Sequence, residues 1–196
     1  MAFINQEAKE IHCKVVYYGP SLSGKTTNIQ WVYQKTAPQD RSELMEFNTN
    51  PERTLFFDFL PMNVGKIRGL NTRFHLYTVP GQVVYDASRK LILKGLDGVI
   101  FVADSQLERM EENIEAMKNL EKNLEQQGYD IRQIPLVIQY NKRDLPNVAS
   151  VAELRAALNR YNAPDFEATA SIGRGVLESL RTVSKTIITT LKGGET

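Results

Sequence analysis

The chain has 196 residues, 42% hydrophobic and 24% charged, with a net charge of +1. These values predict one soluble domain over residues 1–196 and give no electrostatic reason to expect binding to nucleic acid or an anionic membrane. The single cysteine, Cys13, excludes an internal disulfide and suits a reducing, cytoplasmic compartment, and without a membrane-length apolar run or lipid-attachment motif we expect no direct membrane anchor.

The first predicted strand and helix enclose a phosphate-binding pattern. The apolar run 15–18 predicts a buried strand, residues 27–35 predict a helix, and the segment 19–26 between them matches G-x-x-x-x-G-K-[ST]. In this P-loop the glycines let successive amides point at phosphate oxygens, Lys25 can reach the outer phosphates, and the Thr26 hydroxyl is suited to Mg²⁺. A chance glycine turn is disfavoured by the flanking strand and helix. The expected phosphate-binding residues are Gly19, Ser21, Leu22, Ser23, Gly24, Lys25, Thr26 and Thr27.

The next elements predict a hairpin followed by a loop that can sense phosphate. After an irregular stretch at 36–51, strands are expected at 53–61 and 72–79, antiparallel and joined by a turn at 63–69. Alternation in the second strand favours a surface or edge position for His75 over a ligand role. Beyond that strand, Gly81 can offer its amide to a γ-phosphate and Gln82 can orient an attacking water, while Thr54 could add to Mg²⁺.

The second half of the chain predicts a base-recognition loop. A central strand is expected at 97–104, an amphipathic helix at 106–127 and a buried strand at 134–140. That strand leads into Asn-Lys-Arg-Asp at 141–144. We expect Asp144 to accept hydrogen bonds from the N1–H and exocyclic amine of guanine, Asn141 to brace the loop, and the Lys142 stem to cover the ring. Because an unpaired buried carboxylate is costly, this loop favours GTP over ATP.

A helix at 151–158, a strand at 166–169 and a helix at 176–191 complete the chain. Alternating strands and helices predict an α/β fold of the P-loop NTPase class: a mostly parallel six-stranded sheet with one antiparallel edge strand and helices on both faces.

These motifs, with the runs 54–60, 72–82 and 87–93, make the sequence similar to the bacterial MglA-like branch of the Ras-superfamily small GTPases. The resemblance implies a Ras-like G domain that switches between GTP and GDP with Mg²⁺ and controls cell polarity and motility. It implies a monomer that gathers at a cell pole when GTP-bound, with a Roadblock-fold activator of the MglB type and motility effectors as partners. It also implies that Arg53 is an arginine finger in cis; the alternative is an ordinary solvent-exposed arginine at the start of a strand. The resemblance further implies that the Ala170 amide contacts the guanine carbonyl oxygen.

Two departures from the wider superfamily bear on catalysis. Thr78 replaces the aspartate of Asp-x-x-Gly, a feature that the MglA-like branch shares, and Ser21 replaces a usual P-loop glycine. From these two departures we expect slow GTP hydrolysis without a partner. We expect the catalytic residues to be Gln82, Arg53 and Lys25. A GTP-sensing module with negligible hydrolysis is the main alternative, whereas a P-loop kinase or ATPase is disfavoured by residues 141–144.

Overall fold

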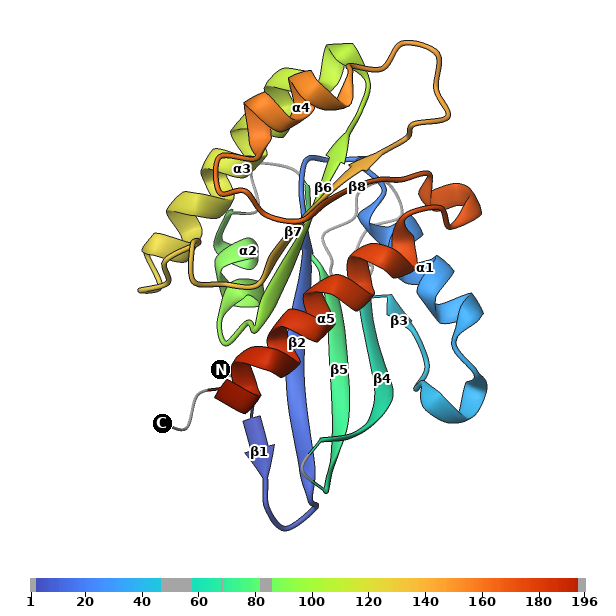
Figure 1. Cartoon of the computed structure of the whole chain (residues 1–196), viewed down its shortest axis with the longest axis vertical. Coiled ribbons are helices and arrows are strands. Elements are labelled where there is room, and N and C mark those ends of the chain that lie inside the picture. Colours follow the sequence, from blue (N-terminus) through green and yellow to red (C-terminus); the bar gives the residue numbers. More distant parts are fainter. Residues whose placement is uncertain (1–2, 47–57, 68, 82–85, 194–196) are drawn as a thin grey trace.

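The computed structural model describes residues 3–46, 58–67, 69–81 and 86–193 (Figure 1). In these ranges the chain alternates strands with helices, and short 3₁₀ turns lie at Pro38–Asp40, Leu107–Arg109 and Ala170–Ile172. The strands are β1 (Phe3–Asn5), β2 (Glu10–Tyr18), β3 (Met45–Glu46), β4 (Asp58–Ile67), β5 (Leu70–Thr78), β6 (Gly98–Asp104), β7 (Leu136–Asn141) and β8 (Asp165–Glu167). The helices are α1 (Lys25–Lys35), α2 (Asp86–Leu93), α3 (Met110–Glu125), α4 (Val151–Leu158) and α5 (Val176–Gly193).

All of these strands join one sheet in the order β3-β4-β5-β2-β6-β7-β8, with β1 paired to β2. Strands β5, β2, β6, β7 and β8 are parallel to one another, and β4 is antiparallel to β5. The predicted six-stranded, mostly parallel sheet is therefore confirmed. The structure adds β1 and β3, both antiparallel to their neighbours. Their three and two residues, outside the alternating strand–helix pattern that places the other strands, show no readable alternation of apolar and polar residues.

The predicted hairpin is present, but its turn was placed too early. Strand β4 runs to Ile67, and its register with β5 shifts between Asn63 and Lys66, so most of the expected turn at 63–69 is strand. Glycine in this stretch is typical of a turn, whereas the sheet accommodates Gly65 where the register of β4 with β5 shifts. The part of the predicted strand at 53–57 lies outside the described residues. Helix α1 begins two residues earlier than predicted, and α4 occupies its predicted range.

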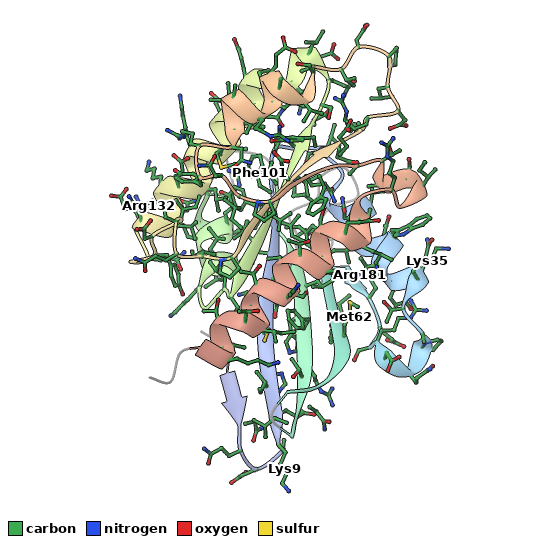
Figure 2. The ribbon with its side chains drawn as sticks, in the orientation of Figure 1. Lys9, Lys35, Met62, Phe101, Arg132 and Arg181 are labelled. Carbon is green, nitrogen blue, oxygen red and sulfur yellow. The ribbon has the colours of Figure 1, made fainter. Side chains whose placement is uncertain are left out.

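Apolar side chains cover both faces of the sheet and form two cores. Helices α2, α3 and α4 pack on one face and α1 and α5 on the other, as Figure 1 also shows. Strand β6 is buried at all of its positions because it lies in the middle of the sheet under both layers. Figure 2 places Phe101 of this strand in the interior, while Lys9 and Arg132 project from the periphery. No helix in the described ranges has the length and apolarity needed to cross a membrane.

This topology brings the predicted motifs together. Because β2, β5, β6, β7 and β8 are parallel, the segments that follow them emerge at the same edge of the sheet, where α/β proteins bind ligands. The P-loop follows β2, Gly81 lies shortly after β5, and Asn141 ends β7.

Candidate nucleotide-binding site

The P-loop turns sharply between β2 and α1 because three of its residues have a positive φ angle. Gly19 (φ 142°) and Gly24 (φ 100°) are glycines, and Leu22 (φ 61°) also has this conformation, with 81% of its surface exposed. A Cβ atom on Gly19 would lie 2.2 Å from the carbonyl oxygen of Val102 in β6. Only glycine therefore allows the loop to pass this close to the neighbouring strand.

The N-terminus of α1 is chemically suited to an anion. Its N-cap residue, Gly24, supplies no side-chain cap, and the first turn contains no acidic residue. The nearby Ser23 hydroxyl is fully buried and has no hydrogen-bond partner among the described residues. The amides that every α-helix leaves without intrahelical partners at its start, the positive end of the helix dipole and the buried Ser23 hydroxyl fit a phosphate group.

Lys25 begins α1 and folds back over the P-loop. The residue is buried, and its Nζ donates hydrogen bonds to the carbonyl oxygens of Gly19, at 3.1 Å, and Pro20, at 2.6 Å. These contacts hold the ammonium group over the loop rather than in solvent. Thr26 and Thr27 follow in the same helical turn and are partly buried.

Asn141 connects three segments at the edge of the sheet. Its Nδ2 donates to the Ser23 carbonyl oxygen at 2.8 Å, and its Oδ1 accepts from the backbone N–H of Ala170 at 2.9 Å. Asn141 is 2% exposed, so it braces the loop from inside the protein. Since the Ala170 amide already has this partner, any contact with a guanine carbonyl would have to share that N–H.

The other two motif residues of the 141–144 loop lie in different surroundings. Lys142 has a φ of 66°, and its Nζ donates to a carboxylate oxygen of Asp104 at 2.6 Å. Asp144 is exposed. The carboxylate that we expected to be buried is therefore open to solvent in the protein alone.

The γ-phosphate side of the site is partly described. Arg89 of α2 is buried and donates to the carbonyl oxygens of Pro80, at 2.8 Å, and Gly81, at 2.6 Å. This guanidinium fixes the chain just after β5. The predicted switch and catalytic residues Arg53, Thr54 and Gln82 lie outside the described residues, so their positions stay predictions.

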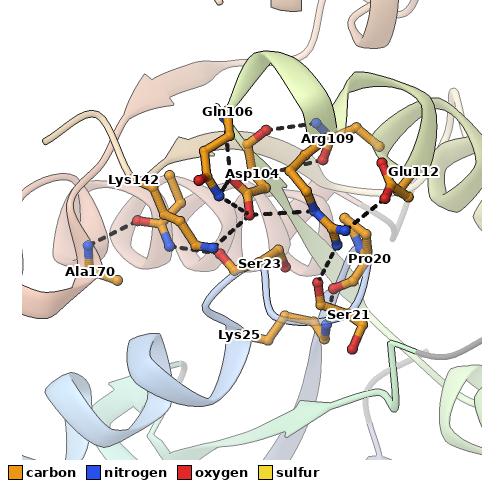
Figure 3. A network of polar contacts seen from close by, with 12 residues as sticks. Pro20, Ser21, Ser23, Lys25, Asp104, Gln106, Arg109, Glu112, Lys142 and Ala170 are labelled. Carbon is orange, nitrogen blue, oxygen red and sulfur yellow. Dashed lines mark hydrogen bonds and ion pairs between the residues drawn. The ribbon is translucent and has the colours of Figure 1, made fainter. Parts of the chain in front are cut away.

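Sequence reasoning missed Asp104 and Arg109. Both lie in a polar network with Lys142 and the P-loop, drawn in Figure 3. The sequence pattern places Asp104 only at the end of a central strand and Arg109 only in an amphipathic helix. An acidic residue at the carboxyl end of the most apolar strand was the available signal, because such a position is buried and faces the site.

Fold and loops together define the class: a P-loop NTPase with the architecture of Ras-like GTPases. The family model described as the ADP-ribosylation factor family matches residues 1–187. The mutual gliding-motility protein MglA of Myxococcus xanthus is 61% identical over 99% of this chain and 100% of its own length.

Two less similar relatives are human proteins. Human ADP-ribosylation factor-like protein 4A is 30% identical over 74% of this chain and 64% of its own length, and human ADP-ribosylation factor-like protein 4C is 29% identical over 85% and 82%. The chain belongs to the ADP-ribosylation factor family of Ras-superfamily small GTPases, enzymes that bind and hydrolyse GTP. The similarity to the MglA-like branch, predicted from the sequence, is confirmed.

Proposed function

We propose that this GTPase is a GTP/GDP switch whose nucleotide is held between the P-loop and the loop at 141–144. The observation that carries this proposal is the pair of hydrogen bonds that Asn141 makes, donating to the Ser23 carbonyl oxygen and accepting from the Ala170 N–H. They join the phosphate side and the base side of the site through one buried side chain. In this arrangement Asp144 selects guanine, with the Lys142 stem against the ring.

Phosphate binding and hydrolysis would be divided among the residues as follows. The P-loop amides hold the phosphates, Lys25 exchanges its loop carbonyls for phosphate oxygens, and the Gly81 amide meets the γ-phosphate. Gln82 orients the attacking water, and Arg53 neutralises charge as it develops. Thr26 and Thr54 would hold Mg²⁺, which would supply charge neutralisation to the phosphates.

The biological role that we infer is control of polarity and motility. Its support is the printed name of a relative, a gliding-motility protein, at 61% identity over nearly the whole chain. We propose a cytoplasmic monomer that gathers at a cell pole when GTP-bound, activated by a Roadblock-fold partner and read by motility effectors. Family membership favours this enzyme over a GTP-sensing module without useful hydrolysis.

Single-turnover hydrolysis of labelled GTP in Mg²⁺, with ATP as the control nucleotide, tests the proposal. We expect turnover of GTP alone, slowed in Gln82→Ala without loss of GTP binding. Arg53→Ala should slow only the hydrolysis stimulated by the activator. Turnover of ATP at the GTP rate would contradict guanine selection, and tight GTP binding without turnover, even with the activator, would support the sensor instead.

A further inference from the structure

Asp104 places a fully buried carboxylate at the carboxyl end of β6. The backbone N–H of Asp104 donates to Oδ1 of Asn113 at 2.9 Å, and its carbonyl oxygen accepts from Nδ2 of the same residue at 2.7 Å. Asn113 belongs to α3 and is itself fully buried. The two hydrogen bonds from the Asn113 side chain therefore fix the backbone of Asp104 at the end of β6. This fixed backbone sets the direction in which the Asp104 carboxylate points.

That carboxylate contacts the base loop. Its Oδ2 accepts the 2.6 Å hydrogen bond from Lys142, and its Oδ1 accepts from the backbone N–H of Gln106 at 3.2 Å and from the Gln106 side chain at 3.1 Å. A buried carboxylate is stable only when it is paired and hydrogen-bonded. The Lys142 ammonium group is thus held at one point, and the methylene stem between that point and the loop backbone is held with it.

The same carboxylate is linked to the P-loop through Arg109. The Arg109 Nε lies 3.8 Å from Oδ2 of Asp104, and a terminal nitrogen donates to the Ser21 carbonyl oxygen at 2.9 Å. The other terminal nitrogen contacts Glu112 at 2.7 Å. Figure 3 shows Asp104 between Lys142 on one side and Arg109 on the other. One anion therefore meets a cation from the base loop and a cation that binds the phosphate loop.

We propose that Asp104 is a positioning residue for guanine-nucleotide binding, which it supports by fixing the Lys142 stem against the base and, through Arg109, the P-loop at Ser21. The inference rests on the proposed GTP-binding function. Asp104 touches neither phosphate nor base in this scheme. Its removal should shorten the lifetime of the bound nucleotide rather than alter the chemical step.

The dissociation rate of fluorescent mant-GDP from the full chain, chased with excess GDP, tests this role. Asp104→Asn keeps the shape but removes the charge, and we expect dissociation about 10- to 100-fold faster, the value of one hydrogen bond to a charged group. Glu112→Gln is the matched control, because it also removes an anion that contacts Arg109, and within the described part of the chain Glu112 makes no contact with Lys142. The dissociation rate of this variant should differ from that of wild type by less than about twofold, as for a solvent-exposed ion pair.

A double-mutant comparison separates positioning from general damage. In a Lys142→Ala background, Asp104→Asn should accelerate dissociation by less than about threefold, because coupled residues do not contribute independently. If the two factors multiply fully, Asp104 acts without Lys142 and the inference is overturned. An unchanged rate in Asp104→Asn alone overturns it as well.

The remaining outcomes are also distinguishable. Circular dichroism reports whether Asp104→Asn folds; should it not fold, the partly exposed Arg109→Gln replaces it, with dissociation expected about threefold faster from loss of the Ser21 contact. An unchanged rate there would overturn the link to the P-loop. Failure of the wild-type protein to bind mant-GDP would overturn the proposed function itself, whereas wild-type binding with unaffected variants would overturn this inference alone.

Discussion

A Cβ atom placed on Gly81 would lie 2.3 Å from the Cα of Ser21, so the backbones of these two residues pack directly against each other. Ser21 belongs to the P-loop, and Gly81 belongs to the segment after β5. Arg89 fixes that segment by donating hydrogen bonds to the carbonyl oxygens of Pro80 and Gly81. A displacement of either segment must therefore move the other. This contact gives a physical route by which a γ-phosphate at the P-loop could change the conformation of the following chain.

Gly81→Ala should weaken binding of a non-hydrolysable GTP analogue by about tenfold more than that of GDP, roughly the loss of one good hydrogen bond from the Gly81 amide, while displacement of Ser21 weakens both. The added methyl forces the two backbones apart, and only the triphosphate needs Gly81 in place. Competition titration against mant-GDP measures both affinities. Gly193→Ala is the control, since nothing lies within 4 Å of its Cβ position. Equal losses for both nucleotides would contradict a γ-phosphate role.

Asn141→Ala should lower both stability and nucleotide affinity. It leaves the Ser23 carbonyl and the Ala170 N–H without their partner, and each unsatisfied buried group costs about 1–3 kcal/mol. Urea unfolding measures the stability and mant-GDP titration the affinity. Asn159→Ala is a matched control, because Asn159 also bridges backbone groups, at Ala163, but outside the site. A comparable affinity loss in Asn159→Ala would mean that the effect is general destabilisation.

Stability should fall on acidification because of His75. Burial, followed by the neighbouring His12, lowers the pKa of His75 from 6.5 to about 4. Between these values the unfolded chain binds more protons than the folded one, so the free energy of unfolding decreases as pH falls from about 6.5 to about 4. The rings of His12 and His75 are stacked, with Nδ1 and Nε2 2.7 Å apart, a contact that needs one unprotonated nitrogen.

Thermal unfolding of wild type and His75→Gln across this pH range measures the effect. The wild-type midpoint should drop more steeply than that of the variant, because the variant lacks the His75 imidazole whose pKa burial lowers. Glu10, Lys14 and Arg73 also act on His75, and they remain in the variant. Parallel curves for the two proteins would show that His75 does not carry the pH dependence.

The sequence predicted those parts of the site that local motifs specify. It did not predict the contacts that side chains from different segments make in the folded protein. The P-loop and Asn141 follow from local motifs, and their place at one sheet edge follows from alternating strands and helices. The role of Asp104 depends on three side-chain contacts, with Lys142, Arg109 and Asn113. No motif or spacing in the sequence predicts them.

Element boundaries show the same limit. The turn predicted at 63–69 is mostly strand because the pairing that β5 supplies outweighs the local turn preference of a glycine-containing segment. His75 was expected at an edge or on the surface, but β5 lies between β4 and β2, and the side chain is half-buried against His12. Alternation in a single strand identifies its two faces correctly but cannot tell how many neighbours the strand has.

The burial of Cys13 makes the native protein nearly inert toward thiol reagents. This only cysteine of the chain is completely buried, and burial, with a smaller effect of Asp97, raises the pKa of its thiol to about 12. Since the thiolate is the reactive form, a maleimide dye at neutral pH should leave Cys13 unmodified. A cysteine engineered at the exposed Gln39 would then accept a single fluorophore without background, and the wild-type chain is already suited to site-specific labelling.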